Sequence, residues 1–403
     1  MIKTKLLRSN TNKKRFCIIV IIFIILFVLV LPIKPFSTQA SGSADGQEKL
    51  NQSIEQLIGG LDLRDLEKYL QSLDGDYGDT VAKRLSDYIK GKDFNYGGFF
   101  DGIVEVLLKK VRDILPAFAC IIAIALLSGI ISSLKSGSLG ASSTDTILLI
   151  SYVSALIPLM SVLTQCFLTA YTCVNGLQKQ MQIIYPILLT LMATSGGGAS
   201  VAVCRPAVAF FSTNIVSIIT SLVFPLTITI ICFSIAGNLS KELKISKFSA
   251  FFKSINKWII GVCVSVFGIF FTLQGITTAT YDGIVRRATK YAIGNGVPIV
   301  GGFLSGGFDL AVASSVLIKN ALGSMSIFMM VALLFEPIVT LLSTNLLLRF
   351  TSAVTQPLGD SKISDFLGES ADNLHFCTAG LLMVAFLYFL SIMMFVSLSE
   401  ALF

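Results

Sequence analysis

Long apolar runs, separated by short polar or glycine-rich segments, dominate the chain from residue 113 onward. Most of these runs reach the roughly 20 residues that an α-helix needs to cross a bilayer. They cover residues 113–134, 146–172, 181–204, 206–237, 258–280, 323–348 and 377–399. The alternation of single apolar and polar residues that an outer-membrane barrel needs is not visible in the sequence. The pattern therefore predicts an all-α, polytopic helical membrane protein with about seven spans, in a range of about six to eight.

Two glycine clusters interrupt this pattern. Their members are Gly196, Gly197 and Gly198 in the first, and Gly301, Gly302, Gly306 and Gly307 in the second. Glycine leaves φ unrestricted and Pro298 lacks an N–H, so the stretch 291–310 favours a broken helix. Unpaired backbone at membrane depth is tolerated only inside protein or beside a wet cavity. We therefore expect re-entrant, pathway-forming elements, a loop at the membrane surface, or close helix contacts, with 292–320 as an irregular eighth candidate span.

The first 40 residues have the organisation of a secretory signal. A basic region ends at Arg15, an apolar run covers residues 16–31, and small residues end at Ala40. Cleavage after Ala40 and an uncleaved anchor both remain open, and either one exports the residues that follow. The predicted parts are a signal at 1–40, an exported helical region at 41–112 and a multi-span membrane domain at 113–403.

The region predicted to be exported carries apolar residues at helical spacing. These residues are Leu50, Ile54, Leu57, Ile58 and Leu61, then Leu63, Leu66 and Leu70, then Val81, Leu85, Tyr88 and Ile89. A region of this size buries little core by itself. We expect it to pack on the membrane, on the rest of the chain or on a partner.

The basic residues conflict with a simple alternation of the predicted spans. Export of the N-terminal region places residue 112 outside, and four crossings would place residues 238–257 outside as well. That segment carries several lysines and a single acid, Glu242, so the positive-inside rule places it in the cytoplasm. One of the first four predicted spans must therefore be irregular.

Two segments could account for this irregularity. Pro225 could split the run 206–237 into a hairpin, because proline breaks the hydrogen-bond pattern of a helix. Alternatively, the glycines at 196–198 could make the run 181–204 re-entrant. The residues alone do not choose between the two.

Several ionisable residues lie inside or beside the apolar runs, where each costs roughly 2.5–3.5 kcal/mol unless it is paired or hydrated. Glu336 is the most central, and Pro337 after it leaves a backbone carbonyl unpaired one turn earlier. Glu336 either lines a polar pathway or forms a structural ion pair with Arg205 or Lys319. Arg205 and Arg349 lie near span ends, where long side chains reach toward lipid headgroups.

Composition narrows the classes of function. Hydrophobic residues make up 54% of the chain and charged residues only 14%. The net charge of +7 comes from the first 40 residues, because the remainder holds as many basic as acidic residues. A nucleic-acid partner would need a clustered basic surface, so none is expected. The cysteines form no C-x-x-C pair and His375 is the only histidine, so we expect no metal, no cofactor and no catalytic triad.

Four stretches make the sequence similar to a known family. They are Y-P-I-L-L-T-L-M from Tyr185, K-Y-A-I-G-N-G-V-P-I-V-G-G from Lys290, S-S-V-L-I-K-N-A-L-G from Ser314 and Q-P-L-G from Gln356. With the order of signal, exported region and membrane bundle, they resemble the stage III sporulation protein AE family of endospore-forming bacteria. The likeness extends over most of residues 41–403, although the exported part matches by layout alone.

The resemblance implies a subunit of a transenvelope complex in the mother-cell membrane around the forespore. The implied partners are the other stage III A operon proteins, including ring-forming subunits and an ATPase, and indirectly stage II sporulation protein Q. Such a channel or export complex would maintain forespore development and late forespore gene expression. The sequence carries no P-loop motif, so a partner would supply the energy.

Two other classes of function stay open. A stand-alone secondary transporter or permease would couple transport through Glu336 or Arg205, but it ordinarily has an inverted repeat, which the two halves do not show. An intramembrane enzyme would need a nucleophile and a base, or a metal set, and no such residues are spaced to work together. We therefore expect a non-enzymatic membrane subunit in contact with the lipid bilayer.

Overall fold

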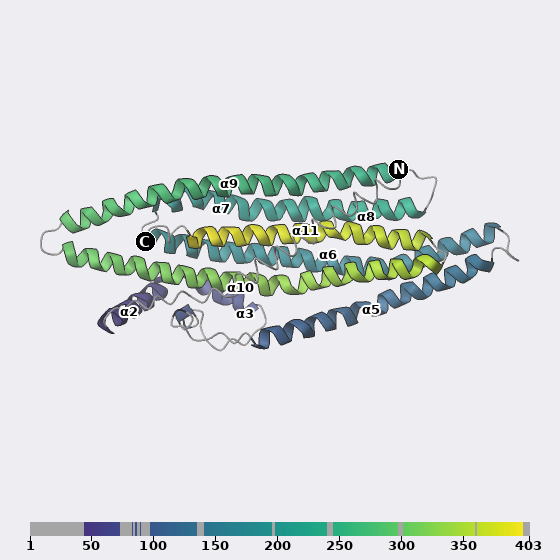
Figure 1. The fold of residues 1–403 in the computed structure, drawn as a ribbon, viewed down its shortest axis with the longest axis horizontal. Helices are drawn as coiled ribbons and strands as arrows, with labels where there is room; N and C mark the ends of the chain where they lie inside the picture. Colours follow the sequence, from purple (N-terminus) through teal and green to yellow (C-terminus); the bar gives the residue numbers. More distant parts are fainter. Residues whose placement is uncertain are drawn as a thin grey trace.

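The computed structural model of the chain is an elongated bundle of long α-helices that run along one axis (Figure 1). It describes residues 44–72, 83, 85, 86, 89, 97–134, 141–195, 198–239, 245–296, 301–358 and 361–397. The segment predicted as a signal, residues 1–40, lies outside this part of the chain. The described residues form helices and no strand, which confirms the predicted all-α fold.

Six antiparallel rods make up the described part of the bundle (Figure 1). They are α5 (Gly97–Leu134), α6 (Ala141–Thr194), α7 (Gly198–Ile218) continued by the π-helical turn η1 (Ile219–Val223) and α8 (Phe224–Leu239), α9 (Ser246–Gly296), α10 (Gly301–Thr355) and α11 (Ser361–Ser397). A short 3-10 turn, η2 (Gln356–Leu358), follows α10. Among the described residues, six helices are long and apolar enough to cross a membrane, at the lower end of the predicted range.

Two predicted spans, 146–172 and 181–204, were expected to be separate, but α6 runs without a break from the first into the second. The polar residues between them suggested a connection. In the helix, however, Lys179 and Gln182 lie exposed on the outer face, whereas Leu177 is buried and the buried Gln180 side chain donates to the carbonyl of Ser326. A helix on a bundle surface needs apolar residues on its inner face only. The prediction of two separate spans is therefore wrong.

The irregularity near Pro225 does not produce a hairpin. Pro225 has no N–H to donate to the preceding turn. The π-helical turn η1 precedes it, and the Phe224 N–H donates to the carbonyl of Ile219, five residues earlier. Single π turns occur inside α-helices in this way. As a result, α7, η1 and α8 continue as one rod, and the predicted hairpin is wrong.

The first glycine cluster lies at a connection between two rods. α6 ends at Thr194 and α7 begins at Gly198, while Gly196 and Gly197 lie outside the described residues. The run 181–204 is thus divided between two helices, α6 and α7, and is not a single helical segment.

The second glycine cluster opens α10. This helix runs without interruption for 55 residues. Its first two turns contain Gly301, Gly302, Gly306 and Gly307. Each glycine lowers helix propensity by about 1 kcal/mol relative to alanine. Helix growth is cooperative, so a long helix tolerates such positions near its end. The irregular span predicted at 292–320 is therefore wrong for the described residues, which belong to the end of α9 and the start of α10.

The region predicted to be exported packs on the rest of the chain, one of the three outcomes expected for it. α2 (Ala44–Gly60) lies against α10 (Figure 1), and α3 (Arg64–Ser72) contacts α6. The Ser314 hydroxyl donates to the Ser53 hydroxyl at 2.9 Å, and Leu66 is fully buried. The apolar positions of α2 and α3 thus join the buried core of the bundle.

Candidate functional site

Glu336 forms an ion pair at the surface of the bundle. Its Oε1 lies 2.6 Å from Nζ of Lys110 on α5. The Glu336 side chain keeps 55% of its surface exposed and the Lys110 side chain keeps 27%. The predicted ion pair therefore exists, but the predicted partners, Arg205 and Lys319, are wrong. Because both charges reach solvent or headgroups, Glu336 does not need an internal polar pathway to be stable.

The structure does not bring the three predicted ionisable site residues together. Lys319 precedes Glu336 on α10 by roughly 25 Å, at 1.5 Å per residue. Arg205 lies near the start of α7, and its side chain is exposed, as the sequence suggested. These residues occupy separate environments on separate parts of the bundle.

Lys319 is fully buried and contacts the end of α11. Its Nζ donates to the carbonyl of Val396 at 2.9 Å, in the last turn of a helix that ends at Ser397. Carbonyls in a last turn have no partner inside their own helix, and a cation there also faces the negative end of the helix dipole. Lys319 therefore caps α11 from a neighbouring helix, which helps to offset the cost of burying its charge.

Gly323 lies one turn after Lys319 on the same face of α10. A Cβ at this position would lie 2.5 Å from Cγ2 of Val396 and 3.5 Å from Cγ2 of Ile392. Only a residue without a Cβ lets two helices approach so closely. The stretch S-S-V-L-I-K-N-A-L-G from Ser314 thus places a cap and a close-packing position one turn apart.

Close packing at glycine can be followed only where the surroundings are described, which leaves out Gly196, Gly197, Gly301, Gly302, Gly306 and Gly307. A Cβ at Gly198 would meet no atom within 4 Å, so this member of the first cluster makes no close helix contact. In contrast, a Cβ at Gly380 of α11 would lie 3.2 Å from Ile219 and 3.3 Å from Phe224. The sequence offered no cluster to mark Gly380, because it is a single glycine inside an apolar run.

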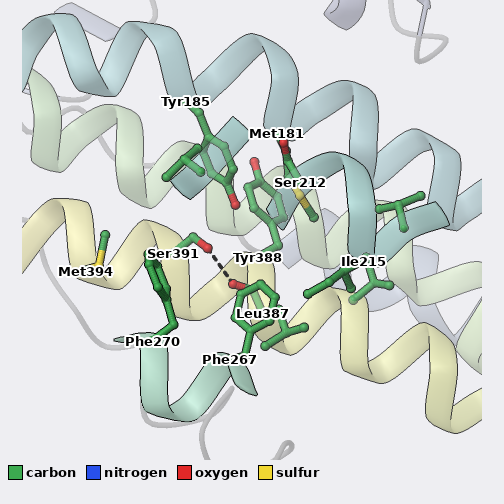
Figure 2. A pocket seen from close by; sticks show the side chains of 13 residues that line it. Met181, Tyr185, Ser212, Ile215, Phe267, Phe270, Leu387, Tyr388, Ser391 and Met394 are labelled. Atoms are coloured by element: carbon green, nitrogen blue, oxygen red, sulfur yellow. Dashed lines mark hydrogen bonds between the residues drawn. The ribbon is translucent and has the colours of Figure 1, made fainter. Parts of the chain in front are cut away.

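Sequence reasoning also missed buried polar groups between α6, α10 and α11. The Gln180 side chain donates to the carbonyl of Ser326 at 3.0 Å, and both residues are fully buried. The buried rings of Tyr185 and Tyr388 meet edge to face, with centroids 5.8 Å apart (Figure 2). Tyr185 opens the stretch Y-P-I-L-L-T-L-M, and this stretch was the one feature of the sequence that pointed to these buried polar groups.

A small cavity lies beside these tyrosines (Figure 2). Its volume is about 20 Å³, and its walls include Ser212 of α7, Phe267 of α9 and Ser391 of α11. This volume has room for a single water molecule, which the surrounding hydroxyls can hydrogen-bond. Sites for drug-sized ligands are larger, about 300–1,000 Å³. The cavity can therefore hydrate the buried polar groups but has no room for a solute.

A second polar cluster joins α8, α10 and α11 near the start of α11. Glu369 accepts a hydrogen bond from the Ser234 hydroxyl. Arg349 pairs with Asp372 at 2.7 Å and lies 3.0 Å from Nε2 of His375. Arg349 was expected to reach toward headgroups, but it is held by residues of α11. This cluster fixes the end of α10 to the first half of α11.

An apolar groove of about 270 Å³ opens between α6 and the rod formed by η1 and α8. Leu163, Phe167, Phe224 and Ile228 are among its walls, and no charged residue lines it. Such a surface suits lipid chains or an apolar helix better than a polar solute. Among the described residues, no three His, Cys, Asp or Glu side chains gather as metal ligands.

Comparisons with known proteins identify the family. Residues 80–399 match the family described as stage III sporulation protein AE, and this range contains all six described rods. The chain is also similar to stage III sporulation protein AE of Bacillus subtilis (strain 168), with 22% identity over 378 residues that cover 92% of this chain and 95% of that protein. No solved structure matches. The resemblance seen in the sequence is confirmed: the chain belongs to the stage III sporulation protein AE family, and its role is in sporulation.

Proposed function

We propose that this chain is a non-enzymatic membrane subunit of the channel or export complex between mother cell and forespore. The observation that carries the proposal is the family match over residues 80–399, which includes all six apolar rods of the described chain. A sporulation protein with six such helices fits the mother-cell membrane around the forespore. In that position it would support forespore development and late forespore gene expression.

The proposed partners are the other stage III A operon proteins, including ring-forming subunits and an ATPase, and indirectly stage II sporulation protein Q. Two features of the chain support an assembly of this kind. The sequence has no P-loop, so any energy must come from another subunit. Helices α2 and α3 pack on α10 and α6 and keep one face exposed, as at Gln52 and Lys68, which adds a surface that a partner can contact.

The contacts of the candidate site favour a structural role. Lys319 and Gly323 hold α11 on α10, and the pair of Lys110 with Glu336 ties α5 to α10. A bundle held in this way keeps its shape and can present fixed surfaces to other subunits. A stand-alone transporter needs a solute site, and the cavity beside Tyr185 and Tyr388, at about 20 Å³, gives that alternative no support.

Deletion of the gene tests the proposed function. We expect forespores that engulf normally and then fail to switch on a late forespore-specific reporter. Restoring the native gene should restore the reporter. Normal spores from the deletion strain would overturn the proposal.

Purification separates the proposed subunit from a transporter. The tagged chain, isolated from sporulating cells with mild detergent, should bring ring-forming proteins of the same operon with it. Solute uptake by proteoliposomes containing only this chain, without those partners, would instead favour the transporter.

A further inference from the structure

We infer that the bilayer covers only one half of the bundle, at an oblique angle, and that the other half projects from the membrane as a water-exposed helical head. The head comprises residues 172–194 of α6, 198–217 of α7 and 301–335 of α10, with α2 and α3 packed on it. The lipid belt comprises the exposed apolar residues of the other half.

The outer face of α6 changes character at Tyr171. From Leu149 to this residue α6 exposes the large apolar side chains Leu149, Ile150, Val153, Ile157, Leu168 and Tyr171, together with the polar Ser161, Thr164 and Gln165. Beyond it the exposed residues are Thr172, Lys179, Gln182, Pro186, Thr190, Ala193 and Thr194. At 1.5 Å per residue, 149–171 is about 33 Å long and matches the roughly 30 Å hydrocarbon core of a bilayer. The rest of α6 adds a similar length whose outer face is small or polar.

The exposed side chains of α10 change in character at the same level as those of α6, where level means position along the bundle axis. A contact between α6 and α10 shows which residues lie side by side. The Cys173 thiol of α6 lies 3.5 Å from the carbonyl of Leu333 of α10, one turn before Glu336. After Glu336, α10 exposes the large apolar side chains Leu342, Leu346 and Phe350. From residue 309 to 335 it exposes none, because other helices cover it.

The rod of α7, η1 and α8 shows the same change. Its exposed residues in the second half of α7 are Thr213, Asn214 and Ser217. From η1 onward it exposes Leu222 and Ile228. Gly380 of α11 contacts η1. Two contacts relate α11 to α10: the carbonyl of Ala371 accepts from the Asn345 side chain, and Ile392 lies beside Gly323. Gly380 lies between those two contacts, so the change on this rod falls near the level of Glu336.

Charged residues mark this edge of the belt. Lys109, Arg112 and Asp113 of α5 are exposed, and Lys110 pairs with Glu336. Lysine and arginine at the end of a span reach toward lipid phosphates. The ion pair of Glu336 therefore lies in the headgroup region, which explains why a carboxylate inside an apolar run can stay exposed.

The belt is inclined to the bundle axis, as α9 shows. This helix exposes large apolar side chains from Phe248 to Ile269, again about 32 Å at 1.5 Å per residue. Along the bundle axis, the exposed apolar residues of α9 end about three helical turns closer to the far end of the head than Tyr171, where the outer face of α6 changes. Asn256 donates to the Thr227 hydroxyl of α8 at 2.9 Å, which fixes this offset. Membrane helices tilt by about 20° on average and by up to about 40°, so an inclined belt is ordinary.

The two ends of α9 agree with this placement. Lys247 lies just before this run, and Lys253 and Lys257 lie in the half of it that is farther from the head, where long lysine side chains extend toward the headgroups of that side. Beyond Ile269, polar residues such as Gln274 come first, and charged residues follow from Asp282, with Arg286 and Arg287 adjacent. Such a sequence belongs in water or at an interface and not in hydrocarbon.

The native tryptophan provides a direct test. Trp258 is the only tryptophan of the chain, and 70% of it is exposed in the belt. The protein is reconstituted in phosphatidylcholine vesicles with or without bromine on the acyl chains, because bromine quenches tryptophan on contact. Two variants carry Trp258→Phe together with either Leu168→Trp in the belt or Thr190→Trp in the head. Both positions lie on the outer face of α6, about six turns apart.

Brominated lipid should quench the native protein and the Leu168→Trp variant, and should leave emission of the Thr190→Trp variant unchanged. Iodide on both sides of the vesicle should quench only the Thr190→Trp variant. Gln182→Trp gives a second head position if Thr190→Trp does not fold, as judged by circular dichroism. Equal lipid quenching in belt and head variants would overturn the inference, as would a loss of lipid quenching in the belt variant.

Discussion

Gly323 allows α10 and α11 to approach so closely that an added methyl group has no room. In the variant Gly323→Ala, the new Cβ would lie 2.5 Å from Cγ2 of Val396. Overpacking of this kind costs about 1–3 kcal/mol, so the melting temperature in detergent should fall. Gly261→Ala is the matched control, because a Cβ there meets no atom within 4 Å and alanine favours the helix by about 1 kcal/mol.

The double variant Gly323→Ala with Val396→Ala separates the effect of the clash between α10 and α11 from the effect of alanine on helix propensity. Removing the valine methyl groups makes room for the new Cβ, so the double variant should recover part of the lost stability. If Gly323→Ala melts like the Gly261→Ala control, then α10 and α11 are not in close contact there.

Glu336 and Lys110 form an exposed ion pair, and such pairs contribute little. We expect Glu336→Gln to lower the free energy of unfolding by less than about 1 kcal/mol, to leave membrane insertion intact and to support normal sporulation. Melting in detergent and spore counts check this. The exchanged pair, Lys110→Glu with Glu336→Lys, should behave like the native protein. A stable Glu336→Gln protein that fails in sporulation would revive the polar pathway proposed from the sequence.

At the scale of the elements, the packing of α3 on α6 should depend on pH. Burial raises the pKa of Tyr69 from its ordinary 10.0 to about 12, because the charged phenolate cannot be solvated there. The neutral form is the one that packs, so the stabilisation is complete below pH 10 and is lost as the pH rises toward 12. Spin labels on Lys68→Cys and Lys179→Cys should give a narrow distance distribution at pH 8 that broadens above pH 10.

The control for this measurement is Tyr69→Phe, which cannot ionise. Its distance distribution should not change over the same pH range. If both proteins broaden alike, other groups control the alkaline transition and Tyr69 is not responsible.

Some elements could be predicted from the sequence and others could not, for physical reasons. The helical class follows from run length, because a bilayer demands long apolar segments. The continuity of α6 does not, because a hydropathy average cannot distinguish a polar loop from a helix that exposes Lys179 and buries Gln180 in a hydrogen bond to α10. Likewise, the partner of Glu336 is set by helix packing that brings Lys110 beside it, and one sequence holds no signal of that pairing.

At the scale of the whole molecule, the continuity of α6 removes the conflict over orientation. Three rods, and not four spans, lie between the region of α2 and α3 and the lysine-rich segment at 238–257. If each of these described rods crosses the membrane once, the odd number of crossings puts the two regions on opposite sides. The positive-inside rule then agrees with export of the N-terminal region without any re-entrant element.

Thiol labelling distinguishes three crossings from four. Single cysteines are placed at Gln52, Arg205 and Lys247, all exposed, in a variant whose native cysteines are replaced. With three crossings, an impermeant maleimide should label Gln52→Cys and Arg205→Cys from the same face of membrane vesicles, and Lys247→Cys from the other. If 181–204 crossed separately, Arg205→Cys would label from the face opposite Gln52→Cys, and Lys247→Cys would join Gln52→Cys. Because the two arrangements give reversed patterns, the result decides whether α6 is one crossing that continues into the head.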